Sequence, residues 1–339
     1  MSDSRPFVVT ADWHWTASSR SSYRFSVVDF LLRLCSERRI GTVFMLGDLT
    51  TEKDKFPGSF IRKVVSEFRR LLSKDGPIDR FYFLVGNHDF IDVPTFAVLG
   101  EVFPDRVVVI ERPRVVDEAG MRIGLIPFGR HKRFFENGLK DVGPVDMVMT
   151  HGLFAGSRIG GTVSERGPSP DVGVPVLAGD VHASQTVGDV TYVGSPYHVD
   201  FGDDFDPRVL VVHAADRFET VTTDLVRKHV VRCGRDDAVE TASRLSVRPY
   251  DQVRFVVHTP PVSASETRKL ADAVRDNLAS GVFAGVRFVF ERSGREGVKD
   301  ANVDFSPEGV FSSYCRMTGI SGDLYEFGME CVREVSGRG

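Results

Sequence analysis

The stretch FYFLVGNHD, residues Phe81–Asp89, places a polar segment directly after an apolar run that is typical of a buried strand. The same arrangement occurs at four other places. Apolar runs at residues 7–10, 42–46, 146–150 and 174–177 are each followed, within three residues, by Asp or His. Polar residues that follow strands in this way gather at one edge of an open α/β sheet, where such sheets keep their ligand sites. The sequence therefore predicts a single metal centre assembled from five distant segments.

The polar residues of these segments are of metal-ligand types, and they are Asp12, His14, Asp48, Asn87, His88, Asp89, His151, Asp180 and His182. Their oxygen and imidazole groups suit Mn²⁺, Mg²⁺, Fe or Zn²⁺, and the motifs contain no Cys. A lone Asp-x-His segment carries little weight. Five such segments in order, each after a strand, are improbable by chance.

Composition excludes several classes of protein. The 339 residues suffice for one large domain and a smaller one. The net charge of −4 does not supply the basic face of a stand-alone nucleic-acid binder. Apolar runs are too short to span a membrane, and Met1–Pro6 leads straight into the first strand without room for a signal peptide. We therefore expect a soluble, cytoplasmic protein with no membrane association.

Strand and helix patterns alternate up to about residue 224. Amphipathic helices are predicted over residues 23–39 and 60–72. Beyond residue 105, closely spaced strand patterns predict two sheets packed face to face with helices outside; these strands are expected at residues 107–110, 121–126, 190–193, 209–213 and 218–223. The Gly-, Ser- and Pro-rich segment 155–173 is expected to be a long loop, either functional or disordered. Residues 1–224 are therefore predicted to form one α/β domain.

A second unit is predicted over residues 225–298. A strand at residues 253–258, a helix at 263–278 and a strand at 286–290 make a small α/β lobe. Residues 299–339 continue as a linker and a tail with apolar residues at spacings that predict two short helices. This tail either packs on its own domain or docks a partner.

In their order, Asp-x-His, Gly-Asp, Gly-Asn-His-Asp, His and Gly-x-x-His make residues 7–213 resemble the calcineurin-like metallophosphoesterases, a superfamily with two metal ions. The resemblance implies a four-layer αββα sandwich, here with a small α/β capping lobe and a helical C-terminal tail. By the same resemblance the two metals would be held by Asp12, His14, Asp48 and His182, and by Asp48, Asn87, His151 and Asp180. Two divalent ions are expected, Mn²⁺ first, with Mg²⁺, Fe or Zn²⁺ as alternatives.

The chemistry implied is the hydrolysis of a phosphoester. Two ions about 3.5–4 Å apart can activate water and clamp the attacking and leaving oxygens of the phosphate. The resemblance places His88 against the scissile phosphate, where it would stabilise charge and protonate the leaving oxygen. Asp89 would orient a neighbouring ligand or His88, as carboxylates beside metal ligands do.

Position 180 departs from the superfamily pattern. The superfamily usually has Gly-His-x-His, whereas this chain has Gly-Asp-Val-His at residues 179–182. Aspartate still offers an oxygen ligand, but it is shorter than histidine and carries a negative charge. We predict a second metal site that prefers Mn²⁺ or Mg²⁺ and fills less readily.

The segment Tyr192–Asp203, followed by Asp206–Arg208, resembles SbcD-type DNA nucleases, and their phage branch above all. The resemblance implies DNA as substrate, a lobe that positions DNA, a tail that binds an SbcC-type coiled-coil ATPase, and a homodimer, in a bacterial cell or a phage-infected host. One feature departs from it. Family members often carry a further His just after Gly-Asp, whereas Leu49 follows here, so exonuclease action is expected to be weaker or differently arranged.

Candidate DNA contacts lie outside the five segments, and they are Arg130, His131, Lys132, Arg133 and His198. Each has a plainer reading, because short charge runs are usually solvated surface and His198 could merely pack in its turn. Two other functions stay open for the whole chain. One is a stand-alone phosphodiesterase or phosphatase acting on nucleotides, small phosphoesters or phosphoproteins. The other is a weakly active binding subunit in which Asp180 has crippled the second metal site.

Overall fold

The computed structural model describes residues 5–53, 56–89, 94–131 and 133–290, together with isolated residues between 311 and 332. Residues 1–289 form one compact unit and residues 290–339 form a second. Every candidate ligand belongs to the first unit. The finer division at residues 224 and 298, which the sequence suggested, stays a prediction.

The first sheet has six strands in the order β14-β13-β1-β2-β3-β4. Their bounds are β1 (Phe7–Thr10), β2 (Thr42–Leu46), β3 (Arg80–Leu84), β4 (Val107–Ile110), β13 (Arg208–Ala214) and β14 (Arg217–Thr222). Strands β1 to β4 run parallel, with Val9 beside Phe44 and Phe44 beside Tyr82, and β13 pairs antiparallel with β1. Parallel strands are buried on both faces, which explains why the sequence shows them as continuous apolar runs.

The second sheet also has six strands, in the order β11-β12-β10-β7-β6-β5. Their bounds are β5 (Arg114–Glu118), β6 (Met121–Ile126), β7 (Met147–His151), β10 (Val176–Gly179), β11 (Gln185–Val187) and β12 (Val190–Tyr192). The inner four strands are parallel, and β5 and β11 pair antiparallel at the two edges. Gly179 lies opposite His151, so β7 and β10 end at the same level.

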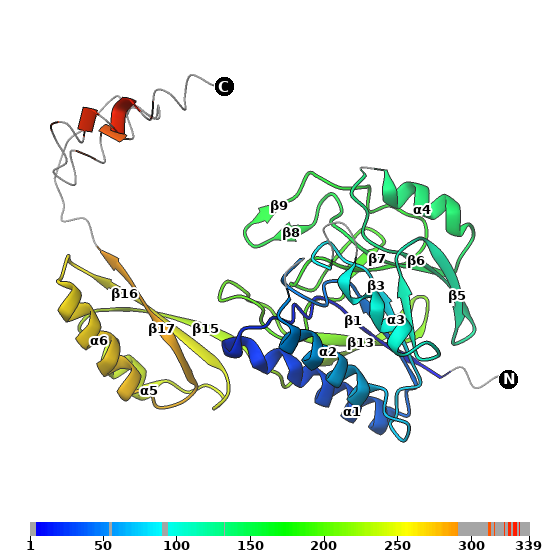
Figure 1. Ribbon diagram of the computed structural model, residues 1–339, viewed down its shortest axis with the longest axis horizontal. Coiled ribbons are helices and arrows are strands. Elements are labelled where there is room, and N and C mark those ends of the chain that lie inside the picture. Colours follow the sequence, from blue (N-terminus) through cyan, green and yellow to red (C-terminus); the bar gives the residue numbers. More distant parts are fainter. Residues whose placement is uncertain are drawn as a thin grey trace. The chain divides into compact units, whose positions relative to one another are not determined.

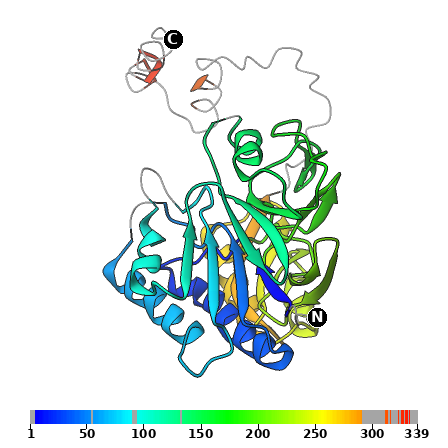
Figure 2. The same ribbon diagram turned by 90° about the vertical axis from the view of Figure 1, so that its right-hand side faces the viewer.

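Helices complete a four-layer αββα sandwich. Helices α1 (Val27–Arg38) and α2 (Gly58–Leu71) pack on the outer face of the first sheet, and α4 (Phe134–Val142) packs on the second (Figure 1). Figure 2 shows the blue-to-cyan strands side by side between the blue helices and the green strands. Phe44 and Leu125 are fully buried between the sheets, and burying one such side chain contributes about 1.5–3 kcal/mol. The predicted fold class is confirmed.

Two local details of the sandwich differ from the sequence prediction. The helix predicted at residues 23–39 is confirmed from Val27 onward as α1, but its first residues belong to a 3₁₀-helix, η1 (Ser19–Ser26). The segment 155–173, expected to lack secondary structure, carries a hairpin of β8 (Arg158–Ile159) and β9 (Thr162–Val163). Both differences come from contacts that a periodicity argument cannot detect. Helix α3 (Val98–Val102) and the 3₁₀-helix η2 (Thr95–Ala97) complete the sandwich.

A three-stranded sheet follows the sandwich in sequence. It consists of β15 (Lys228–Gly234), β16 (Gln252–Thr259) and β17 (Val282–Phe290), in that order, with α5 (Ala238–Arg244) and α6 (Ala264–Asp276) against one face. Helix α6 starts at a capping box, in which the Glu266 backbone N–H donates to Ser263 Oγ at 3.2 Å and the Ser263 N–H donates to Glu266 Oε2 at 2.9 Å. The lobe is therefore larger than the strand, helix and strand that the sequence predicted.

The second unit is described only in part. The predicted helical tail, residues 299–339, lies mostly outside the described residues, and so does most of its predicted docking surface. Within the tail, the rings of Phe311 and Tyr325 stack with their centroids 6.0 Å apart. The Ser312 and Tyr325 hydroxyls lie 2.8 Å apart. Among the described residues, no helix is long and apolar enough to cross a membrane.

Candidate metal centre

The backbone turns sharply where the candidate ligands leave their strands. Asp12, His14, Asp48 and Asp180 have φ angles of 56°, 47°, 57° and 90°. Residues other than glycine seldom adopt this left-handed region, which costs of order 1–3 kcal/mol at each position and persists at functional sites. The strained backbone at these four residues thus directs their side chains toward one point.

Two glycines allow the strand ends to meet. A Cβ atom at Gly47 would lie 2.3 Å from His151 Nδ1, and one at Gly179 would lie 2.1 Å from the Leu46 carbonyl oxygen. Any other residue would push β2 away from β10 or displace the His151 ring. The glycine before the aspartate in each of these two motifs therefore has a steric cause.

The first cluster consists of Asp12, His14, Asp48 and His182. Ligand atoms of Asp12, His14 and Asp48 lie within 4.8 Å of one another, and His182 Nε2 lies 3.1 Å from His14 Nε2. Asp12 Oδ2 is buried and has no hydrogen-bond partner among the described residues. Two facing imidazole nitrogens and an unpartnered carboxylate oxygen are what a bound cation would satisfy. The residues present therefore fit a metal ion.

The second cluster consists of Asp48, Asn87, His151 and Asp180. His151 Nδ1–H donates to the Leu46 carbonyl at 2.7 Å, which directs Nε2 into the site. This nitrogen lies 2.8 Å from the Asn87 side-chain amide, 3.4 Å from Asp48 Oδ1 and 3.6 Å from Asp180 Oδ1. A carbonyl that fixes the tautomer of a histidine in this way is typical of metal-binding sites.

Asp48 belongs to both clusters. Its Oδ2 lies 3.4 Å from His14 Nε2, and its Oδ1 lies 3.4 Å from His151 Nε2. One carboxylate therefore presents one oxygen to each cluster, the arrangement required of a ligand that bridges two ions.

Burial and mutual charge shift the pKa values of the clusters. Burial raises the pKa of Asp12 to about 7, because its carboxylate loses water. Burial, together with neighbouring His182 and His88, holds the pKa of His14 well below its usual value. Burial also acts to lower the pKa of His151, but the Asp48 and Asp180 carboxylates outweigh it and raise that pKa well above its usual value. The clusters thus favour bound positive charge.

Asp89 is buried behind the site and ties two ligand segments together. Its Oδ2 accepts the backbone N–H groups of Gly86 at 2.7 Å and Asp48 at 2.9 Å, and its Oδ1 accepts that of Thr50 at 3.4 Å. Burial and the nearby Asp48 carboxylate raise its pKa to about 7. Its position is that of a residue that orients ligands, the role the sequence suggested for it.

His88 faces the centre without joining either cluster. Its backbone N–H donates to Asp48 Oδ1 at 2.9 Å, and its Nδ1–H donates to the Thr51 carbonyl at 3.0 Å. Its ring centroid lies 5.0 Å from that of His14. The half-buried side chain lines a cavity of about 200 Å³ together with Asp48, Asp180 and both histidines of the first cluster. Nε2 is therefore the nitrogen that can reach a bound substrate.

Arg24 was not among the site residues predicted from the sequence. Its buried guanidinium donates to the His14 carbonyl, to Thr51 Oγ1 at 3.1 Å and to the Val199 carbonyl at 2.9 Å. It joins three loops around the centre that lie far apart in the chain. A single arginine in a helical pattern carries no signal for such a role.

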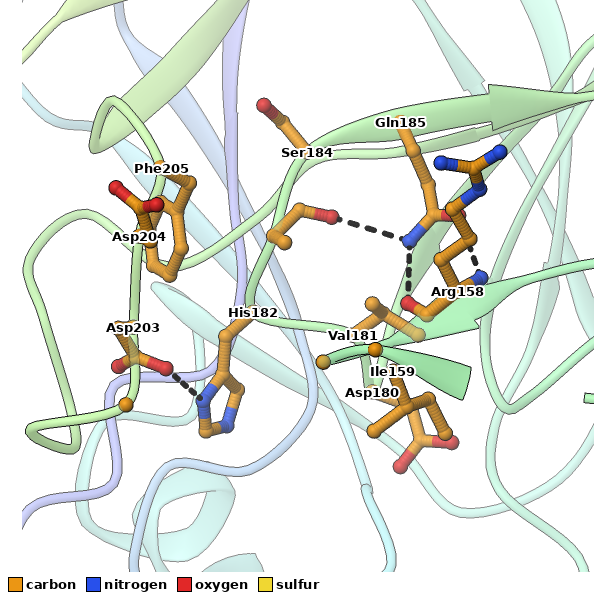
Figure 3. Close-up of a pocket in the computed structure, with 14 residues that line it drawn as sticks. Arg158, Ile159, Asp180, Val181, His182, Ser184, Gln185, Asp203, Asp204 and Phe205 are labelled. Atoms are coloured by element: carbon orange, nitrogen blue, oxygen red, sulfur yellow. Dashed lines mark hydrogen bonds and ion pairs between the residues drawn. The ribbon is translucent and has the colours of Figure 1, made fainter. Parts of the chain in front are cut away.

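Asp203 was also missed, although it lies in the segment that resembled SbcD-type nucleases. Its Oδ1 lies 3.7 Å from His182 Nδ1, and Figure 3 shows the two side chains pointing toward each other. Burial acts to lower the pKa of His182, but Asp203 and Asp12 outweigh it and raise that pKa. Asp203 thus orients His182 from outside the first cluster.

Three cavities meet at Asp180. Asp180 lines the cavity of about 200 Å³ at the centre, one of about 660 Å³ and one of about 600 Å³. The 660 Å³ cavity, shown in Figure 3, is bordered by Arg158, whose backbone is held at both ends by the Gln185 side chain at 2.8 Å. The centre therefore adjoins two larger cavities.

The predicted DNA contacts differ in their placement. Arg130 and His131 are exposed and line the 600 Å³ cavity, Arg133 is exposed just before α4, and Lys132 lies outside the described residues. His198 is only 5% exposed; its Nε2–H donates to the Phe205 carbonyl at 2.9 Å and its Nδ1 accepts the Lys228 N–H at 3.0 Å. Its ring is engaged in packing, so its position does not support the predicted DNA contact.

Comparison with known proteins adds a family match. Residues 5–193 match the family model described as calcineurin-like phosphoesterase. A search of curated proteins finds no match.

Solved structures with a similar fold include an archaeal phosphodiesterase (13% identity, TM-score 0.37, covering 64% of this chain and 99% of that one). A nuclease from Pseudomonas putida is also similar (16% identity, TM-score 0.33, covering 65% and 78%). A third is a protein of unknown function from Aquifex aeolicus (12% identity, TM-score 0.30, covering 55% and 89%).

Proposed function

This chain belongs to the calcineurin-like phosphoesterase family, whose members hydrolyse phosphoesters with divalent metals, and we propose that it is a Mn²⁺-dependent DNA phosphodiesterase. We propose further that it is the nuclease subunit of an SbcC/SbcD-like recombination and repair complex in a bacterial cell or a phage-infected host. The observation that carries the phosphodiesterase proposal is the position of Asp48, which offers one oxygen to each of two ligand clusters.

In this proposal some residues hold the metal ligands in place, and one residue transfers a proton. Two ions bound at the clusters would activate water and offset charge on the phosphate. His88 Nε2 carries the proton that passes to the leaving oxygen, while the Thr51 carbonyl fixes the ring through Nδ1. Asp89 holds the backbone of Asp48, and Arg24 holds the backbone of His14, so that the ligands keep their geometry during the reaction.

DNA is proposed as the substrate because the centre adjoins two larger cavities. A polymer needs room beyond the cleaved phosphate, and cavities of about 660 and 600 Å³ border Asp180 of the centre. Arg158 lines the first, and Arg130 and Arg166 line the second, so basic side chains border both cavities although the chain carries a net charge of −4. The resemblance of residues 192–208 to SbcD-type nucleases points the same way.

The direct test is cleavage of linear and hairpin DNA by the purified full chain with Mn²⁺, with and without an SbcC-type ATPase. We expect cleavage that is lost in Asp48→Ala and kept in Asp105→Asn, which changes an exposed carboxylate. If the protein cleaves DNA in neither condition but hydrolyses a small phosphodiester, the DNA proposal is wrong and the protein is a stand-alone phosphodiesterase.

The ATPase partner and a homodimer belong to the same proposal. We propose that the tail, residues 299–339, binds the ATPase. Removal of this tail is expected to abolish co-purification with the ATPase and to leave small-phosphodiester hydrolysis unchanged. Light scattering of the full chain tests the dimer, and a monomer at micromolar concentration would contradict it.

A further inference from the structure

A cavity of about 600 Å³ adjoins the second cluster and differs from the others in its lining. We call it the aromatic cavity and define it by Phe128, Phe134, Phe135, Leu153 and Arg166. We infer that the aromatic cavity binds the nucleobase of the nucleotide whose phosphate is cleaved at the metal centre. This inference rests on the proposed function and deepens it, because it assigns a place to the base.

The aromatic cavity is continuous with the metal centre. His151 and Asp180, both of the second cluster, line its inner end. The Phe128 ring stands edge-on to the His151 ring, with centroids 6.3 Å apart and an interplanar angle of 82°. A phosphate at the second cluster therefore has the aromatic cavity beside it, at the reach of the sugar and base of one nucleotide.

One wall of the cavity is built on a glycine. A Cβ atom at Gly129 would lie 1.9 Å from the Phe134 ring. Only glycine lets this ring approach the loop that follows β6 so closely, and Phe134 lines the cavity there. The loop itself is fixed, because the Phe128 backbone N–H donates to the Val85 carbonyl at 2.9 Å.

The opposite wall is built in the same way. Gly167 has a φ angle of 105°, and a Cβ atom there would lie 2.0 Å from the Leu153 carbonyl oxygen. The Ala155 N–H donates to the Pro168 carbonyl at 3.0 Å. This hydrogen bond holds the loop that carries Arg166 close to the segment that follows β7. Both walls are thus preformed, and the volume lies in the range of small-ligand sites.

The residues that line the aromatic cavity suit a flat, apolar ring that is attached to a negatively charged group. Phe128, Phe134, Phe135 and Leu153 are half-buried and leave apolar surface toward the cavity, while Arg166 is exposed at its border. Nucleobases stack on aromatic side chains whatever their sequence, and the arginine matches the adjoining phosphate. The 660 Å³ cavity is bordered by one phenyl ring, that of Phe205, together with Asp203 and Asp204, so it offers a base less aromatic surface and more negative charge.

The test compares oligonucleotides that carry either a normal base or a tetrahydrofuran abasic analogue at each nucleotide flanking the cleaved phosphate. The Mn²⁺-loaded full chain is used, and kcat/KM is measured for each. We expect abasic substitution on one side of the phosphate to lower kcat/KM by about tenfold, the effect of losing one stacked base. Equal values on both sides would overturn this inference alone. Failure to cleave any of these oligonucleotides would overturn it together with the proposed function.

A variant locates the effect. In Phe134→Ser, the ratio of kcat/KM for normal and abasic substrates is expected to fall toward one, and Phe134→Leu repeats the test with better retention of volume. The matched control is Phe218→Ser, which removes an exposed phenylalanine from β14 and should keep the wild-type ratio. Because the readout is a ratio within each variant, a general loss of activity cancels. An unchanged ratio in both Phe134 variants would contradict the assignment.

Discussion

The two clusters of the metal centre share Asp48 but differ in the chemistry of their ligands. Each has buried ligands and one partly exposed ligand: Asp12 is fully buried and the His182 side chain is 25% exposed in the first cluster, and the His151 side chain is fully buried and the Asp180 side chain is 23% exposed in the second. The first cluster offers two imidazoles and two carboxylates, whereas the second offers one imidazole, one amide and two carboxylates, so we expect the second to prefer a harder ion. The aspartate in place of the usual histidine belongs to this second cluster.

The largest effect is expected from removing the shared ligand. Asp48→Asn should lower hydrolysis of bis-p-nitrophenyl phosphate with Mn²⁺ by about a thousandfold or more, because both clusters lose a ligand at once. Asp105→Asn, on the exposed surface, serves as the matched control. Activity within tenfold of wild type would show that the clusters do not depend on a common carboxylate.

The next effect comes from Asp89, which belongs to neither cluster. Asp89→Asn keeps the size of the side chain but replaces one carboxylate oxygen with an NH₂ group. That group cannot accept the hydrogen bond that a backbone N–H group donates to Asp89. We expect a 10- to 100-fold loss of activity, typical of residues that support metal ligands, with weaker metal binding at both clusters. Calorimetric titration with Mn²⁺ measures it, and a loss confined to one cluster would contradict the positioning role.

A smaller change should follow Asp180→His, which alters only the second cluster. We expect the affinity of the weaker site to rise about tenfold and its preference to move from Mn²⁺ toward Zn²⁺, because imidazole is the softer ligand. The tighter site should stay as it is. Identical stoichiometry, affinity and metal preference in the two proteins would remove position 180 from the account.

The smallest effect concerns pH. Burial raises the pKa of Asp12 from 3.8 to about 7, so its contribution to the stability of the metal-free fold is present below pH 4 and is lost as the pH rises through 7. Relative to wild type, metal-free Asp12→Asn should gain roughly 1 kcal/mol of unfolding free energy per pH unit between pH 4 and pH 7. Urea denaturation at several pH values measures this difference, and a constant difference would contradict the shifted pKa.

Much of this fold could be predicted from the sequence, because its central strands are buried on both faces. The apolar runs at residues 7–10 and 42–46 are β1 and β2 with the same bounds, and those at 107–110 and 121–126 are β4 and β6. The candidate ligands meet because parallel strands end at one edge. Helix α5 was missed, since seven residues are too few to show a helical period.

The parts that could not be predicted depend on contacts between distant segments. In the sequence, Arg24 has the pattern of a surface residue on a helix. In the structure, its guanidinium donates a hydrogen bond to the carbonyl of Val199, which is 175 residues away. His198 is a polar residue beside the site whose ring is used in packing. The aromatic cavity depends on the close approach of Phe134 to Gly129 and of Gly167 to Leu153. The spacing of residues along the sequence does not reveal these contacts.

Asp48 is expected to join two metal sites that differ in their ligands. Electron paramagnetic resonance of the Mn²⁺-titrated full chain tests it most directly, because ions that share a carboxylate are magnetically coupled. We predict two Mn²⁺ per chain, the second binding more weakly, with a coupled signal in wild type and no coupled signal in Asp48→Asn. A single ion per chain, or two ions without coupling, would contradict the account.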